Sequence, residues 1–108
     1  MVMILPTRPH PGLMARLGYA PDQIIAVMRD DLVRQIEATP APEIEPVIRR
    51  AVVTADGRLG EPDRSDWGPF DWTLTLHGIT ATGDTLAEAV AQWRNCARRT
   101  AQAAEDAA

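Results

Sequence analysis

The stretch WTLTLHGITATGDTLAEAVAQW, residues 72–93, changes from an alternating repeat to a helical repeat within a few positions. His77-Gly78 fits a two-residue hairpin turn, in which glycine supplies the positive φ that such turns require. The resulting register predicts one apolar face and one threonine face, as in a sheet with one buried side. The predicted pairs are Leu76–Ile79, Leu74–Ala81 and Trp72–Gly83 on the apolar face, and Thr75–Thr80 and Thr73–Thr82 on the other. We expect Gly83 to leave room for the Trp72 ring.

The segment after this hairpin predicts a helix over 84–104. Thr85 and Glu88 have the spacing of a capping box, and Asp84 adds negative charge beside the positive end of the helix. A narrow apolar stripe follows: Leu86, Val90, Trp93, Ala97 and Ala104. The helix can therefore cover the apolar face of the hairpin. The alanine-rich tail, 105–108, is expected to fray.

A second helix is predicted upstream, over 21–38. Pro21 suits the first helical turn and Asp22 suits the positive helix start. The apolar positions Ile24, Ile25, Met28, Leu32 and Ile36 form one stripe. The segment 1–20 is rich in proline and glycine and is expected to be irregular, with at most a strand at Val2–Leu5 and one or two helical turns around Leu13–Leu17.

Residues 47–54 fit either a helix or a strand. Val47, Ile48, Ala51 and Val52 have helical spacing, whereas the β-branched density and the Asp56-Gly57 turn favour a strand. We therefore expect the sheet to span 44–83, interrupted by a long loop at 56–71 that could hold a short strand near Arg58–Leu59. Loops of this length tend to be functional or mobile.

These segments predict a single α+β domain over residues 1–108. The expected architecture is a small antiparallel sheet of about three strands packed against two helices, in the order α-β-β-β-α. The open edge of the hairpin could pair across a two-fold axis, so a homodimer is a further expectation.

The composition limits the function. The chain has no lysine, which excludes Schiff-base chemistry and a P-loop. Its net charge of −4 argues against direct nucleic-acid binding. No apolar run is long enough to span a bilayer, and the opening MVMIL lacks the features of a secretion signal. With one cysteine as well, we expect a cytoplasmic protein.

The chemistry-bearing residues are few. Ser65 lies in an acidic loop without the glycine elbow of a serine nucleophile, and Cys96 is interpreted as buried filler. His77 is interpreted as an exposed turn residue and His10 as a loop residue. No Cys/His spacing matches a metal site. We therefore expect no enzyme, no cofactor and no metal.

Two groups of residues are candidate binding sites. The first is the mixture of carboxylates and aromatic rings in the long loop, because aromatic residues on polar loops often anchor protein interfaces. Its members are Glu61, Asp63, Asp66, Trp67, Phe70 and Asp71. The second is the arginine cluster late in the final helix, Arg94, Arg98 and Arg99, which could contact phosphate.

Two local resemblances involve the hairpin and the final helix. The order of elements, and the segment 72–93 in particular, resembles the last hairpin and helix of the double-stranded RNA-binding domain, which implies RNA binding; here the helix start carries Glu88 and no base. The segment GDTLAEAVAQW, residues 83–93, resembles HicB-type antitoxins, which implies neutralisation of a small basic toxin.

The whole chain resembles small accessory proteins of phages and mobile elements, including anti-CRISPR inhibitors, in its size, acidity and lack of catalytic chemistry. This resemblance implies a non-catalytic protein that occupies a basic surface of a nucleic-acid-handling complex and so inhibits or regulates it. The candidate contact residues are those of the acidic and aromatic loop.

Overall fold

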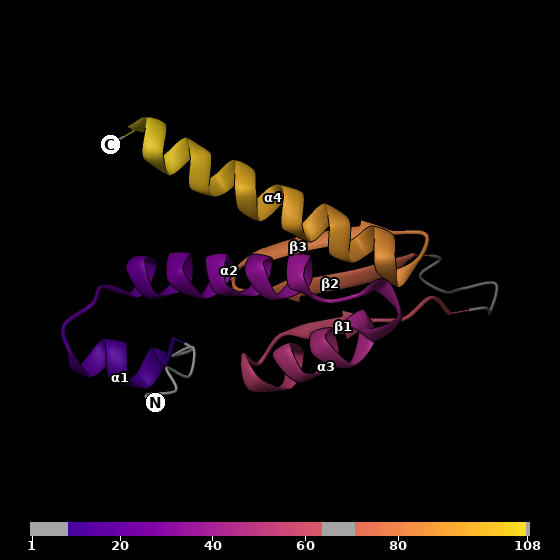
Figure 1. Cartoon of the computed structure of the whole chain (residues 1–108), viewed down its shortest axis with the longest axis horizontal. Helices are drawn as coiled ribbons and strands as arrows, with labels where there is room; N and C mark the ends of the chain where they lie inside the picture. Colours follow the sequence, from indigo (N-terminus) through magenta and orange to yellow (C-terminus); the bar gives the residue numbers. More distant parts are fainter. Residues whose placement is uncertain (1–8, 64–70, 108) are drawn as a thin grey trace, which may run out of the picture.

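The computed structural model describes residues 9–63 and 71–107. Four α-helices lie in these ranges: α1 (Pro11–Arg16), α2 (Pro21–Ala38), α3 (Ile44–Thr54) and α4 (Leu86–Ala107), with a 3-10 turn, η1 (Ala41–Glu43), before α3. The three strands are β1 (Arg58–Gly60), β2 (Trp72–Leu76) and β3 (Ile79–Gly83). The fold is α+β with a three-stranded antiparallel sheet, and the segment from α3 to α4 has the expected order α-β-β-β-α (Figure 1).

The hairpin register is confirmed at all five pairs. Leu76 faces Ile79, Leu74 faces Ala81 and Trp72 faces Gly83, while Thr75 faces Thr80 and Thr73 faces Thr82. His77 and Gly78 both have positive φ, as the turn requires. Leu74 and Leu76 are wholly buried, whereas Thr80 and Thr82 are exposed. The sheet therefore has one buried side and one threonine side.

All three longer helices cover the buried side of the sheet (Figure 1). α4 packs on β3 and β2, α2 packs beside α4, and α3 packs against β1. The largest buried side chain of α4 is Trp93. It is 0% exposed and donates its indole N–H to the Leu76 carbonyl at 3.0 Å. That hydrogen bond satisfies the polar end of a ring that is otherwise buried among apolar side chains.

The preference for a strand over 47–54 is wrong, because this segment forms α3. Ile48 is 0% exposed, while Val53, five residues later, is 82% exposed. Ile44, Ala51, Val52 and Ala55 pack around Ile48 at helical spacing. The segment follows its helical repeat and not its β-propensity, because packing on the core outweighs the intrinsic preference of β-branched residues for strands. The first strand is instead the short segment Arg58–Gly60.

Gly83 has a different role from the predicted one. A Cβ built on this residue would lie 2.5 Å from the backbone nitrogen of Ala89 in α4, and its nearest neighbours do not include Trp72. The glycine therefore permits close approach of the final helix to the sheet. Thr85 caps that helix, because its hydroxyl accepts the Glu88 N–H at 3.1 Å.

The predicted helix over 21–38 is confirmed as α2, with Pro21 in its first turn. The predicted helix over 84–104 starts at Leu86 and extends to Ala107, so the expected frayed tail is helical to that residue. α1 supplies the expected helical turns within the irregular N-terminal segment. The expected strand at Val2–Leu5 lies outside the described residues.

Candidate functional site

Carboxylates gather at one end of the molecule. The strand partners Gly60–Thr73 and Trp72–Gly83 bring the end of β1, the start of β2 and the end of β3 together. The starts of α3 and α4 lie at the same end (Figure 1). We call this region the acidic end, and its described members, all exposed, are Glu43, Glu45, Glu61, Asp63, Asp71, Asp84 and Glu88.

The preference for negative charge at helix starts explains the positions of several of these carboxylates. Glu43 and Glu45 lie at the start of α3, and Glu88 lies in the first turn of α4. Asp84 comes just before α4. Negative charge is favourable at these positions because the N-terminus of a helix carries partial positive charge. The antiparallel sheet then adds the ends of β1 and β2 to the same region.

Arg49 is a basic residue that forms ion pairs with two members of this group. Its guanidinium contacts Glu45 at 2.9 Å and Glu61 at 2.5 Å, so it links α3 to the residue after β1. These hydrogen bonds, with Glu61 first and Glu45 second, raise the pKa of Arg49 above its ordinary value. The pairing fixes the chain after β1 to α3, and Asp71, Asp84 and Glu88 add further exposed carboxylates to the acidic end.

The predicted loop site is only partly placed by the structure. Glu61, Asp63 and Asp71 are exposed at the acidic end. Glu61 is paired with Arg49. Asp66, Trp67 and Phe70 lie outside the described residues, so their part of the prediction stays a prediction.

The three arginines of the predicted phosphate site do not act as one group. Arg98 forms an ion pair with Glu37 of α2. Arg94 is half-buried and donates to the Asn95 side chain at 3.4 Å, while Arg99 is exposed. Arg98 thus joins α4 to α2, although its side chain is 55% exposed, and Arg99 is exposed as well.

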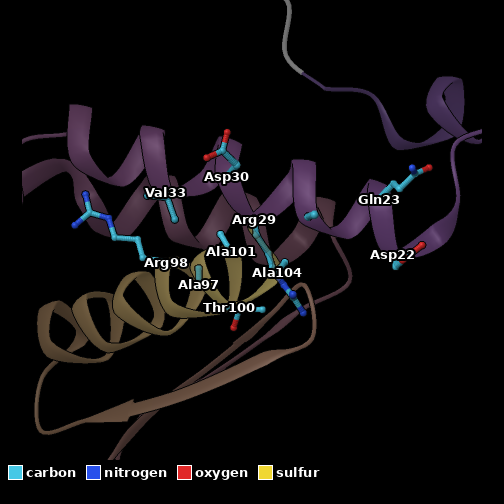
Figure 2. A pocket seen from close by; sticks show the side chains of 11 residues that line it. Asp22, Gln23, Arg29, Asp30, Val33, Ala97, Arg98, Thr100, Ala101 and Ala104 are labelled. Atoms are coloured by element: carbon cyan, nitrogen blue, oxygen red, sulfur yellow. The ribbon is translucent and has the colours of Figure 1, made fainter. Parts of the chain in front are cut away.

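The cleft between α2 and α4 has a volume of about 350 Å³. Figure 2 shows Val33 of α2 and the small side chains Ala97, Ala101 and Ala104 of α4 between the two helices, with Asp30 pointing away from α4. Asp30 is paired with Arg34 at 2.8 Å. Asp30 and Arg98, which line this cleft, thus already have charged partners, and its interior is mainly apolar.

A larger groove, of about 690 Å³, lies between α1, α2, α3 and the hairpin turn. Its apolar wall includes Ile24, Ile25, Met28 and Val47, and its polar rim includes His10, Asp31, Gln35, Arg50, Asp56 and His77. The rim makes local contacts: Gln35 donates to Asp31 at 2.8 Å, and the His10 ring accepts the Leu13 N–H at 3.2 Å as a cap of α1.

His77 is not the exposed turn residue that the sequence predicts. It is half-buried, and its ring lies 6.4 Å from that of Trp93, measured between centroids. Its carbonyl accepts a hydrogen bond from Arg29 Nε at 2.8 Å, which ties the hairpin turn to α2. Burial lowers the pKa of His77 below its ordinary value, the charge of Arg29 lowers it further, and Asp31 opposes this shift.

Within residues 9–63 and 71–107, no group of three or more His, Cys, Asp or Glu side chains could hold a metal ion. Cys96 is half-buried and packs against the core. No helix among the described residues is long and apolar enough to cross a membrane.

The sequence-based site omitted four members of the acidic end: Glu43, Glu45, Asp84 and Glu88. A signal for Asp84 was present, because the confirmed hairpin register places it near Asp71, next to the Trp72–Gly83 pair. Glu43 and Glu45 could not be included while residues 47–54 were assigned to a strand. Their position depends on α3.

The chain was also compared with known proteins. No protein-family model matches it, and no curated protein or solved structure shows significant similarity to it.

Proposed function

We propose that this chain is a non-catalytic interaction protein that binds a basic surface of a nucleic-acid-handling protein complex and so inhibits or regulates it, in the manner of an anti-CRISPR inhibitor. The observation that carries the proposal is the acidic end, where seven exposed carboxylates from four segments of the chain lie at one end of the molecule. A surface that binds nucleic acid is positively charged, so it is electrostatically complementary to this end.

The arrangement favours recognition of a groove over catalysis. Most of these carboxylates lie at or beside the ends of helices and strands that pack on the core, so the fold gathers their charges at one end of the molecule. Such a gathering of like charges accelerates association with an oppositely charged partner, and added salt screens the attraction. Among the described residues, Cys96 packs on the core, the His10 ring caps α1, and burial disfavours protonation of His77. These roles support a non-catalytic protein.

The experiment compares two variants of the whole chain that lose the same number of charges. The first carries Asp71→Asn, Asp84→Asn and Glu88→Gln at the acidic end. The matched control carries Asp22→Asn, Glu105→Gln and Asp106→Asn, all exposed and on other parts of α2 and α4. Each protein is immobilised, a host lysate is passed over it, and captured proteins are identified and eluted with increasing salt or with duplex DNA.

The proposal predicts capture of a nucleic-acid-binding complex that elutes with salt and competes with duplex DNA. The acidic-end variant should bind this complex at least 10-fold more weakly, a loss of about 1.4 kcal/mol of binding free energy, whereas the control should bind like the natural chain. Equal binding by the two variants, or elution that does not depend on salt, would contradict the proposal.

Two other outcomes distinguish the alternatives. A captured partner that is a single small basic toxin, neutralised by the chain, would indicate a HicB-like antitoxin. A shift of duplex RNA by the chain alone in a gel would indicate an RNA-binding module and contradict the proposal, since the acidic first turn of α4 should repel phosphate.

A further inference from the structure

β3 is an edge strand with an open side. In the sheet order β1-β2-β3, its other edge pairs with β2. In a hairpin with a two-residue turn, the residues flanking the turn form a hydrogen-bonded pair, and bonded and non-bonded pairs alternate from there. Leu76–Ile79, Leu74–Ala81 and Trp72–Gly83 are therefore bonded pairs. The N–H and C=O groups of Thr80 and Thr82 point away from β2.

These outward groups are accessible. Thr80 and Thr82 are exposed, and within residues 9–63 and 71–107 their backbone groups have no hydrogen-bond partner. The strand ITATG also contains no charge, no proline and no bulge, which are the usual features that keep an edge strand from pairing with another chain. The edge is thus a row of two donors and two acceptors without a protecting feature.

The strand is complementary to itself about a two-fold axis at Ala81. An antiparallel copy in this register places Thr80 opposite Thr82 of the second copy, and Thr82 opposite its Thr80. Each such pair exchanges two hydrogen bonds, so all the outward groups of Thr80 and Thr82 on both strands are satisfied. All five residues of β3 take part, and neither strand overhangs the other.

The side chains fit the same register. On the threonine side, Thr80 would lie beside Thr82 of the second copy, repeating the cross-strand contact already present between the Thr75 and Thr80 hydroxyls at 3.0 Å. On the helix side, Ile79 would lie opposite Gly83 of the second copy, and Ala81 opposite its Ala81. Large and small side chains alternate, so the buried side accepts the second strand without a clash between two large groups.

We propose that two copies of this chain associate through β3 and form a continuous six-stranded sheet of order β1-β2-β3-β3-β2-β1. The threonine side and the helix-covered side each extend across the two-fold axis. The two acidic ends then lie at opposite ends of the joined strands, because the central pair is antiparallel.

The test uses variants of the whole chain and two measurements. Thr82→Pro removes an outward donor and leaves the β2–β3 hydrogen bonds in place, since proline is tolerated where an edge N–H faces solvent. Thr73→Lys is the matched control, because it alters the same face of the sheet on the central strand. Sedimentation equilibrium gives the mass, and circular dichroism checks that each variant has the natural helix content.

The natural chain and Thr73→Lys should sediment with twice the 11.8 kDa of one chain as concentration rises, and Thr82→Pro should remain at one chain. In hydrogen exchange, the Thr80 and Thr82 amides should become protected at least 10-fold more at high concentration than at low. A natural chain that stays monomeric, or a dimer in which these two amides exchange freely, would overturn the proposal.

Discussion

Two regions of the molecule differ in how far their apolar side chains are buried. In the sheet core, which consists of β2, β3 and residues 86–97 of α4, Leu74, Leu76 and Trp93 are wholly buried. In the arm, which consists of α1 and residues 17–28 up to the middle of α2, Leu17 is 68% exposed and Leu13 is 50% exposed. The radius of gyration, 15.5 Å, exceeds the value of about 13 Å expected for a compact chain of this length. The arm contributes to this extension (Figure 1).

The comparison shows that burial depends on the presence of a covering layer and not on composition alone. The sheet core has a strand face and a helix stripe that match along their length. The arm has only α1 against α2, so its outer apolar side chains contact water. An apolar surface that a small chain leaves uncovered is a candidate for contact with another molecule. The core therefore supplies stability, whereas the arm and the groove beside it remain available for contacts.

The largest expected effect comes from removing the centre of the sheet core. Trp93→Ala should lower the free energy of unfolding by about 3–5 kcal/mol, because a large ring leaves a cavity between α4 and the hairpin. Urea unfolding followed by circular dichroism measures this loss. Trp93→Phe keeps most of the ring volume and should cost clearly less. A loss below about 1 kcal/mol for the alanine variant would mean that this region is not the core.

A smaller effect tests the contact between helix and sheet. Gly83→Ala places a Cβ against the Ala89 backbone and should lower the free energy of unfolding by about 1–3 kcal/mol, since neither the strand nor the helix backbone can easily move. Gly60→Ala is the matched control in the same sheet, because its Cβ would meet the Thr73 Cβ at an ordinary 3.6 Å. Equal unfolding free energies for the two variants would contradict the close approach of α4.

The half-buried turn predicts a pH dependence. His77 has a lowered pKa in the folded chain, whereas the unfolded chain has the ordinary value of 6.5. Below pH 6.5 the unfolded chain binds the proton more readily, so this contribution to stability is complete above pH 6.5 and is lost as the pH falls. His77→Asn, which tolerates the positive φ at this position, should reduce the loss of stability between pH 7 and pH 5. An unchanged pH profile would contradict the burial of His77.

The smallest effect is expected in the arm. Leu17→Ser should change the free energy of unfolding by no more than about 0.5 kcal/mol, because the side chain already contacts water. Thermal and urea unfolding of the variant should overlay those of the natural chain. A loss of about 2 kcal/mol would show that the arm is covered in solution and that the two regions do not differ as described.

The sequence predicted the sheet core better than residues 47–54, for physical reasons. The turn at His77-Gly78 fixes the register, and a shift of one residue would bury the threonines, so the local pattern and the packing agree on one arrangement. For residues 47–54 they disagree: β-branched residues favour a strand, whereas Ile48 and its neighbours pack as a helix. Only contacts distant in sequence resolve that conflict.

Part of the candidate site could likewise be predicted from the sequence, and part depends on contacts between distant segments. Glu61, Asp63 and Asp71 were predicted from one stretch of sequence, but Glu45 joins them only through α3 and the ion pair of Arg49. The role of Arg98 likewise depends on Glu37, which is far away in the sequence. The sequence alone pointed to the acidic residues of one loop, and the fold determined which other acidic residues lie on the same surface.

Native-state hydrogen exchange tests the contrast between the two regions most directly. The amides of Leu74, Leu76, Ile79 and Ala81, which bond within the hairpin, should exchange only by global unfolding. Those of Leu13, Leu17 and Ile25 should exchange by local opening, at rates at least about 100-fold faster. If the hairpin amides exchanged as fast as those of α1, or if α1 were as protected as the hairpin, the sheet would not be the core that holds this molecule together.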